Sequence, residues 1–431
     1  ASSGDDPILL PLSARSAGAL VASAEQHAEL LAARPDDARD LAIAQALTRD
    51  QHPRRLAVVA SDGEAVAAAL AEVAAGRRSG AAIAGDRRSS EPASVAFLFS
   101  GQGRAWWPLD PELLDDPVIG ATLRTCDTEL REIADFSLLE LIRSGEAVMD
   151  HGRAQPLLFA LQVALAARWR AFGVEPDLIV GQSIGEIAAA HVSGALPLAD
   201  ALEIVLHRGR LMEESNGTGH TAFVELPAAE VEEMVAELDL EVAIAAVTAP
   251  DNCVVSGPKA DTVAIVKAAA ARGVMAQVFD VGDIPGHGPL MAPYADKLTT
   301  AVDFLDPRPT TVPMISSVTA GPVGGEELDA EYWGRNLRQQ VRLLEAIEVA
   351  VDHGAELFIE IAPHPVVSFS TRRTLESIGS DAVVQHTVKQ GEPGALALRR
   401  SLASAWTAGA TVDWRAVTGR GQATARALPS P

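Results

Sequence analysis

The chain has 431 residues, of which 48% are hydrophobic and 22% charged, a globular composition with enough length for two or three compact units. Its formal net charge of -23 argues against nucleic acid and against an anionic membrane surface as partners. Two cysteines build neither a disulfide framework nor a metal site, and we see no membrane span and no signal peptide, so we expect a cytoplasmic protein.

The hydrophobic pattern predicts an α/β chain in which strands and helices alternate. Residues 1–92 contain two strand-like and two helical stretches and are expected to form a small α/β linker domain. The segment GDRRSSEPAS then leads into VAFLFSGQG, a buried strand that ends in a glycine-rich loop. The alternation continues through residues 93–219 and resumes in 282–396 as one large domain. Residues 397–431 start with a last helix and then lose all periodicity.

Residues 220–281 have a pattern of their own between the two parts of the large domain. Their apolar positions predict the order strand, helix, strand, strand, helix, strand. This is the element order of a split, ferredoxin-like unit. We therefore expect a small ferredoxin-like subdomain inserted into an α/β-hydrolase-like large subdomain.

A serine between two glycines, GQSIG, follows the β-branched run Leu178–Val180 and precedes a helix-forming stretch. G-x-S-x-G between a strand and a helix is typical of a nucleophile elbow, a turn so tight that only glycine fits on either side. It exposes the hydroxyl of Ser183 above the end of the sheet, at the positive end of the new helix. The alternative is a glycine–serine turn that only joins two elements.

A serine hydroxyl is a poor nucleophile until a base takes its proton, and the chain offers ten histidines. Most of them, such as His27, His52 and His151, have polar sequence neighbours and are expected at the solvated surface. His287 lies between two glycines in DIPGHGPLM, where the chain returns from the inserted subdomain. No acidic residue is an evident partner for its imidazole, so we expect a backbone carbonyl to orient it.

The loop of FSGQG also follows a buried strand. Beside the elbow, it is placed to offer a backbone N–H to an oxyanion, with the amide of Ile184 as the second donor. A phosphate-binding loop is the alternative, but GQGRAWW lacks the G-x-G-x-x-G spacing.

Seven motifs in order resemble the acyltransferase domain of modular type I polyketide synthases, over almost the whole chain. LLPLSARS and RLAVVAS are similar to the ketosynthase-to-acyltransferase linker. VDWRAV and ALPSP resemble the post-acyltransferase linker, without its usual Tyr-Pro-Phe ending. These flanks suggest a piece of a longer polypeptide with a neighbouring ketosynthase. The seven motifs are FLFSGQG, QPLLFALQVAL, GQSIGEIAAAHVSGAL, HRGRLM, HGPLM, YWGRNLRQQVRL and FIEIAPHP.

The resemblance implies a two-step transfer. Ser183 would attack the thioester of an acyl-coenzyme A with His287 as general base, and the acyl group would then pass to the phosphopantetheine thiol of an acyl carrier protein. Gln102 would form the oxyanion hole with the amide of Ile184, and a carbonyl of IAPHP would hold the histidine. The resemblance implies no bound cofactor and no metal.

Arg208, in HRGRLM, matches the residue that grips the free carboxylate of a malonyl-type acyl group. A planar guanidinium suits this task because it binds a carboxylate through two parallel hydrogen bonds. Gln155 matches a glutamine of the same pocket. From the residues alone, Arg208 would instead be a solvated helix residue.

Three positions depart from the family pattern. Gln182 replaces the histidine that usually precedes the nucleophile, which is expected to alter pocket shape or acyl orientation. Thr248 stands where asparagine is frequent, which puts one polar contact in doubt. Family members usually have Tyr-Ala-Ser-His for methylmalonyl or His-Ala-Phe-His for malonyl, whereas Ile284, Pro285 and Gly286 precede the histidine here. This apolar, open wall predicts a malonyl-coenzyme A with a bulky C2 substituent.

Other functions remain as alternatives. Within the same chemistry, these are an ordinary malonyl- or methylmalonyl-specific acyltransferase, a trans-acting acyltransferase, and a serine hydrolase in which water attacks the acyl-serine. An inactive scaffold is the alternative from a different class. Carrier proteins are usually acidic, as this chain is. Either a basic patch of Arg335, Arg338 and Arg342 or tethering in one polypeptide would then bring the carrier close.

Overall fold

The computed structural model of the chain describes residues 6–87, 91–103, 110–280 and 282–419. The RAWW part of the second glycine-rich loop and the end of the expected C-terminal linker lie outside these residues. None of the described helices has the length and apolar character that a membrane-spanning segment needs. The chain divides into two compact units: a first unit of Ala1–Val95, Arg168–Glu175 and Thr387–Pro431, and a second unit of Ala96–Ala167 and Pro176–His386.

The first unit contains a three-stranded antiparallel sheet in the order β1-β2-β3. Apolar side chains of its strands and of three helices share one buried core, in which Leu10, Leu31 and Val58 are fully buried. The elements of this core are β1 (Ile8–Ala14), α1 (Ala17–Ala33), α2 (Ala38–Thr48), β2 (Arg54–Ala60), α3 (Gly63–Ala74) and β3 (Ala82–Asp86).

The C-terminal helix α15 (Gly394–Ala408) belongs to the same unit and contacts β2 and β3. Its Trp406 is buried, and the guanidinium of Arg55 lies 5.2 Å from the centre of the indole ring. A short helix, α16 (Trp414–Thr418), follows, although the sequence shows no periodicity there. The sequence separates residues 397–431 from the N-terminal linker domain, whereas in the structure this buried tryptophan joins them.

The second unit contains a six-stranded sheet in the order β11-β10-β5-β4-β13-β14. The pairs β10–β5, β4–β5 and β13–β14 are parallel, and β11 is antiparallel to β10. Its central strands are buried on both faces, which explains their continuous apolar runs. The strands are β4 (Val95–Phe99), β5 (Leu178–Gly181), β10 (Met314–Ser316), β11 (Gly321–Val323), β13 (Leu357–Glu360) and β14 (Val383–His386).

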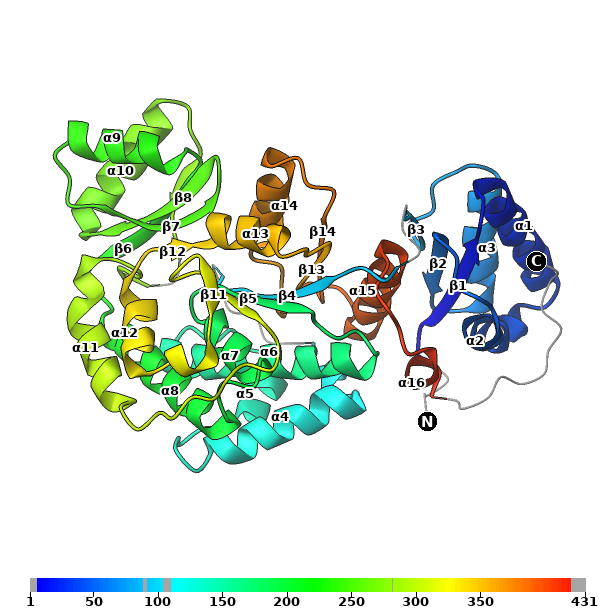
Figure 1. Cartoon of the computed structure of the whole chain (residues 1–431), viewed down its shortest axis with the longest axis horizontal. Helices are drawn as coiled ribbons and strands as arrows, with labels where there is room; N and C mark the ends of the chain where they lie inside the picture. Colours follow the sequence, from blue (N-terminus) through cyan, green and yellow to red (C-terminus); the bar gives the residue numbers. More distant parts are fainter. Residues whose placement is uncertain (1–5, 88–90, 104–109, 281, 420–431) are drawn as a thin grey trace. The chain divides into compact units, whose positions relative to one another are not determined.

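Helices cover both faces of this sheet, with α13 and α14 on one face and α6 and α7 on the other (Figure 1). The strand order reverses at β4, because β5 adds on one side of it and β13 on the other. Ligands of open α/β sheets bind beyond the carboxyl ends of the strands at such a point. The helices of this part are α4 (Pro117–Leu130), α5 (Leu138–Ser144), α6 (His151–Ala171), α7 (Gly185–Val192), α8 (Leu198–Glu214), α11 (Ala292–Ala301), α12 (Ala330–Arg338), α13 (Leu343–Asp352) and α14 (Ser368–Ser377).

The inserted subdomain has the predicted element order and the strand order β7-β8-β6-β9. A fifth strand, β12 (Val341–Arg342), comes from the large subdomain and pairs in parallel with β7. Its two residues are too few to show any periodicity, so the sequence did not predict it. The inserted elements are β6 (His220–Val224), α9 (Ala228–Glu237), β7 (Ala243–Ala249), β8 (Asn252–Gly257), α10 (Lys259–Ala271) and β9 (Ala276–Val278). The predicted α/β class with a ferredoxin-like insert is confirmed.

The turn between β5 and α7 is as tight as the sequence pattern requires. A Cβ atom on Gly181 would lie 2.6 Å from the Cα of Glu186, and one on Gly185 would lie 2.3 Å from the carbonyl oxygen of Phe99. Both obstacles are backbone or backbone-linked atoms that cannot rotate away. Gly181 is therefore needed for close packing of the turn against α7, and Gly185 for close packing against β4.

We predict that Gly185→Ala lowers the free energy of unfolding by about 3 kcal/mol, because the added methyl group overlaps the backbone of β4. Urea unfolding of the wild type and the variant measures the difference. Gly321→Ala is the matched control, because a Cβ atom on Gly321 meets no heavy atom of the described residues within 4 Å. Equal stability of the two variants would contradict the tight packing of the turn.

Candidate active site

Ser183 lies between the end of β5 and the start of α7, with a left-handed φ of 54°. This conformation is unfavourable for a residue with a side chain, and the surrounding turn holds it in place. The amide of Gln182 donates to the carbonyl of Phe99 at 2.9 Å, and the amide of Gly185 donates to the carbonyl of Gln182 at 2.9 Å. The serine thus stands at the carboxyl end of the sheet, where the strand order reverses.

The structure brings Ser183 and His287 together, although they are 104 residues apart in the sequence. The hydroxyl oxygen of the serine lies 2.7 Å from Nε2 of the imidazole. Nδ1 of His287 donates to the carbonyl oxygen of Gln339 at 3.0 Å. With the proton on Nδ1, Nε2 is free to accept the serine proton.

A backbone carbonyl orients the imidazole, as predicted, but it is not the expected one. The sequence placed it in IAPHP, whereas it belongs to Gln339, the C-cap residue that directly follows α12. The last carbonyls of a helix have no partner within the helix, so this oxygen is available to an outside donor. Because the contact spans the fold, no local sequence signal marks it.

Burial of His287 and a neighbouring positive charge favour its neutral form. Burial lowers the pKa of the imidazole to about 3, and the positive charge of Arg208 adds to this effect, while the hydrogen bond to Gln339 opposes it. The residue therefore stands as a neutral base at physiological pH.

Arg208 is buried in α8 with a side chain that reaches the nucleophile. Its Nη2 donates to Ser183 Oγ at 3.0 Å, and its Nη1 donates to Gln155 Oε1 at 2.9 Å. Burial lowers the pKa of the guanidinium to about 10, against the opposing charge of Glu186, so it remains protonated. The reading of Arg208 as a solvated helix residue is wrong, because the apolar environment around α8 was invisible in the sequence.

The loop of FSGQG lies against the elbow. A Cβ atom on Gly101 would lie 3.3 Å from Cβ of Ser183. Within the elbow, the amide of Glu186 is occupied by the carbonyl of Ser183 at 3.0 Å. The amide of Ile184 has no acceptor among the described residues, which leaves it available to an oxyanion.

Two predicted site residues make contacts that the sequence did not suggest. The side-chain oxygen of Gln182 accepts from the amide of Gly101 at 2.8 Å, which ties the elbow to the second loop. The side-chain oxygen of Gln102 accepts from Nδ1 of His151 at 3.1 Å. His151 is buried, and so is His27, so the expectation of surface positions for both was wrong. Places for Gln182 in the acyl pocket and for Gln102 in the oxyanion hole stay predictions.

A buried polar cluster beneath the elbow was missed by sequence reasoning. The amide and hydroxyl of Ser317 both donate to Glu186 Oε1 at 2.6 Å, and the hydroxyl of Tyr332 donates to the other carboxylate oxygen. Asn336 donates from its side chain to the carbonyl of Ser183 at 3.0 Å. Burial raises the pKa of Glu186, and its hydrogen bonds oppose that rise. An acid in the first turn of the helix that follows a nucleophile was the one available signal.

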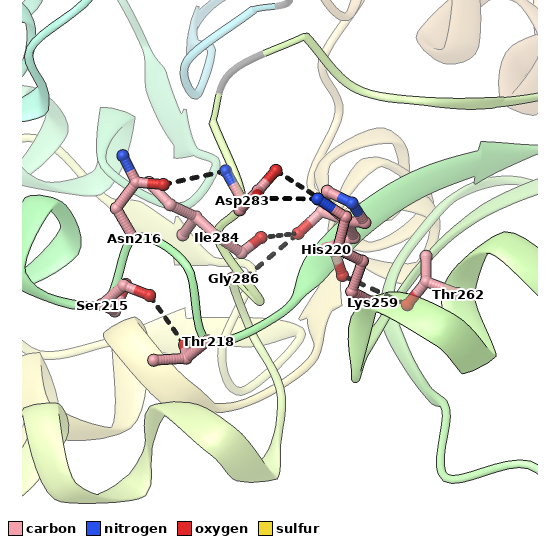
Figure 2. A network of polar contacts seen from close by, with 10 residues as sticks. Ser215, Asn216, Thr218, His220, Lys259, Thr262, Asp283, Ile284 and Gly286 are labelled. Carbon is pink, nitrogen blue, oxygen red and sulfur yellow. Dashed lines mark hydrogen bonds and ion pairs between the residues drawn. The ribbon is translucent and has the colours of Figure 1, made fainter.

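The joint between the two subdomains is held by Asp283, at the start of the segment that carries His287 (Figure 2). Its carboxylate lies 3.0 Å from Nζ of Lys259 and 3.4 Å from Nδ1 of His220. Its amide donates to the side-chain oxygen of Asn216 at 3.0 Å. The chain segment that enters the inserted subdomain and the segment that leaves it are thus bound to each other.

Thr221 binds the next residues of the same segment. Its hydroxyl donates to the carbonyl of Ile284 at 2.7 Å and accepts from the amide of Gly286 at 3.1 Å. These two bonds fix the backbone on both sides of Pro285, directly before the histidine. His287 itself has a left-handed φ of 56°, so its direction depends on that anchored backbone.

Comparisons with known proteins identify the family of the chain. Residues 96–412 match the family model of the acyl transferase domain, and residues 8–70 match the model described as CurL-like, PKS C-terminal. Erythronolide synthase EryA2 of Saccharopolyspora erythraea is 38% identical over 95% of this chain and 12% of its own length. Polyketide synthase GfsA of Streptomyces halstedii is 36% identical over 99% of this chain and 6% of its own. The chain spans a small part of these relatives.

Solved structures give the same result. The acyltransferase domain from module 8 of the salinomycin polyketide synthase is 34% identical, with a TM-score of 0.89 over 96% of this chain and 98% of that one. The acyl transferase domain of SpnD, solved in complex with 2-(pent-4-yn-1-yl)malonyl, is 26% identical, with a TM-score of 0.83 over 94% and 96% of the two chains.

Fold and family together define a transferase of acyl groups. The chain belongs to the acyl transferase domain family of modular type I polyketide synthases, as the seven sequence motifs predicted.

We predict that Thr221→Val lowers kcat/KM about tenfold with a malonyl-type ester, because the carbonyl and the amide beside Pro285 each lose their hydrogen-bond partner. Steady-state release of coenzyme A measures the change, and Thr221→Ser should restore most of the activity. Thr218→Val is the matched control, since it removes a 2.7 Å hydrogen bond to Ser215 in the same joint. Equal losses in Thr218→Val and Thr221→Val would contradict a specific role for Thr221.

Proposed function

We propose that the chain transfers a malonyl-type acyl group from coenzyme A, through an ester on Ser183, to the phosphopantetheine thiol of an acyl carrier protein. The observation that carries this proposal is the buried cation of Arg208 at 3.0 Å from the nucleophile. No carboxylate pairs with it among the described residues, and a buried charge is costly unless it is paired. A free carboxylate on the acyl group would supply the missing partner.

In the first half-reaction, Ser183 Oγ attacks the thioester carbon while its proton passes to Nε2 of His287. The tetrahedral oxyanion would be held by the amide of Ile184 and by Gln102 or its loop. When the intermediate collapses, the carbon–sulfur bond breaks, an ester forms on the serine, and the imidazole proton passes to the leaving thiolate. Free coenzyme A then departs.

The second half-reaction runs the same steps with another thiol. His287 takes the proton of the phosphopantetheine thiol, the thiolate attacks the ester, and the proton returns to Ser183 Oγ as the acyl group leaves. His287 is therefore the base in both half-reactions. Its orienting partner, the carbonyl of Gln339, is neutral, which suits this double role. Attack by water instead of the thiol would make the chain a hydrolase.

The acyl group is proposed to carry a bulky C2 substituent. Ile284 and Pro285 are buried apolar residues, and a Cβ atom on Gly286 would have Thr221 Oγ1, at 3.8 Å, as its nearest described neighbour within 4 Å. The position directly before the histidine thus has space for a Cβ atom that glycine leaves unfilled. The similar SpnD domain was solved with a pentynyl-substituted malonyl group, which shows that a domain of this family can hold such a chain.

A carrier protein and a neighbouring ketosynthase in the same polypeptide are the proposed partners. Of the three arginines considered for docking an acidic carrier, Arg342 is engaged by Glu345 at 2.9 Å, and Arg335 lies over the ring of Tyr332. Arg338 is exposed. One exposed arginine makes a weak patch on a chain of net charge -23, which favours tethering as the source of a high local carrier concentration.

We predict one acyl adduct on Ser183 when the protein is incubated with a malonyl-type coenzyme A ester. Intact-protein mass spectrometry followed by peptide mapping locates it. Ser183→Ala should give no adduct, and His287→Ala should acylate roughly 10²–10⁴-fold more slowly, the usual contribution of a positioned base. An adduct that persists in Ser183→Ala would overturn the assignment, and rapid loss of the adduct to water without transfer to carrier protein would favour a hydrolase.

We predict that esters with butyl or benzyl substituents compete successfully with malonyl- and methylmalonyl-coenzyme A. Each buried methylene contributes up to about 0.8 kcal/mol, so the preference should rise gradually with chain length. Mass spectrometry of the acyl-enzyme formed from an equimolar mixture measures it. Gly286→Phe should shift the product toward the unsubstituted malonyl group. A wild-type preference of about tenfold or more for malonyl or methylmalonyl would refute the open pocket.

A further inference from the structure

The hydroxyl of Ser183 has two partners that make opposite demands on it. His287 Nε2, at 2.7 Å, accepts its proton, whereas Arg208 Nη2, at 3.0 Å, donates a hydrogen bond to its oxygen. A nucleophile attacks through a lone pair on that oxygen. In the free protein, one of these lone pairs is already engaged by a buried cation.

A carboxylate bound along one edge of Arg208 would share Nη2 with the serine and compete for it. Its Nη1 is occupied by Gln155 Oε1 at 2.9 Å, and its Nε has no hydrogen-bond partner among the described residues. The edge of the guanidinium that can receive a carboxylate through two parallel bonds is therefore the one formed by Nε and Nη2. Nη2 is the atom that now holds the serine.

We propose that the Arg208–Ser183 contact is a catch on the nucleophile, which the carboxylate of the incoming acyl group releases by taking the Nε–Nη2 edge of Arg208. This inference rests on the proposed function and adds a second level of selection to it. A dicarboxylic acyl group binds and also frees the serine, whereas a monocarboxylic one binds beside a serine that stays engaged.

The same event changes the strength of the base. The acylation step needs His287 to become positively charged, and the unpaired charge of Arg208 opposes this, in line with the lowered pKa of the imidazole. Two charged groups act here, Arg208 of α8 directly and Glu186 of α7 through its effect on Arg208, and the neutral carbonyl of Gln339 accepts a hydrogen bond from the imidazole. A carboxylate on Arg208 neutralises the group that opposes protonation. A base whose pKa rises toward the working pH is a more effective one.

The catch also distinguishes between thioesters of similar reactivity. Acetyl and other simple acyl thioesters, which are chemically as reactive as malonyl thioesters, fit the site but leave the nucleophile engaged. Selection would then act on the rate of acylation as well as on binding.

The test supplies the carboxylate separately from the acyl group. Acetyl-coenzyme A and formate together contain the groups of a malonyl ester, with the carboxylate no longer bonded to the acyl chain. We expect sodium formate to accelerate acetylation of Ser183 by about tenfold or more over sodium chloride at equal ionic strength. Formation of the acetyl-enzyme is followed by rapid quench and intact-protein mass spectrometry.

Two variants identify the residue that responds to formate. Arg208→Ala removes the catch, so its acetylation should be faster than that of the wild type without formate and should not respond to formate. Arg208→Lys cannot form two parallel hydrogen bonds, so its acetylation should respond only weakly to formate. This variant also keeps the test valid if Arg208→Ala unfolds. Arg210→Ala is the matched control, since Arg210 is an exposed arginine of the same helix, and it should respond as the wild type does.

The pH dependence gives an independent readout. In the complex with a malonyl-type ester, the acylation rate should rise with pH through a higher midpoint than in the complex with acetyl-coenzyme A, because His287 then has no opposing charge.

Two results would overturn the catch while leaving the proposed function intact: no acceleration by formate in a protein that loads malonyl groups on Ser183, or slower acetylation in a folded Arg208→Ala. A protein that loads no malonyl-type ester would instead refute the proposed function itself.

Discussion

A buried positive charge beside the serine is the constraint around which the site is organised. The guanidinium of Arg208 lies between Gln155 and Ser183, and the negative charge of Glu186 raises its pKa against the effect of burial. The oxygens of Glu186 are already bound by Ser317 and Tyr332, so this carboxylate is not free to form an ion pair. The fold thus stabilises a cation without neutralising it, which is the condition that a carboxylate-selecting site needs.

The catalytic geometry depends on three segments that are far apart in the chain. The elbow after β5 presents the serine, the joint that leaves the inserted subdomain presents His287, and the end of α12 presents the carbonyl of Gln339. Asp283 and Thr221 bind that joint to the segment that enters the insert, so the histidine is fixed by the small subdomain while the serine is fixed by the large one. Any movement of the insert would change the distance between nucleophile and base.

The same joint links catalysis to choice of substrate. Ile284, Pro285 and Gly286 lie directly before His287, so the residues expected to face the acyl substituent and the base share one short backbone segment. A change in this segment alters pocket shape and base position together. Substitutions in this segment that change substrate selectivity are therefore expected to lower activity as well, unless the contacts of Thr221 and Asp283 that anchor the segment are kept.

The sequence by itself determined the α/β class, the inserted ferredoxin-like subdomain and the elbow, because each depends on local periodicity or on glycine at fixed positions. It also indicated Ser183 and His287, since loop glycines and an elbow leave a short-range signal. The burial of Arg208, the carbonyl of Gln339, the cluster around Glu186 and the burial of His151 were decided by tertiary structure alone. They arise from contacts between segments far apart in the sequence, whose side-chain environment no local pattern records.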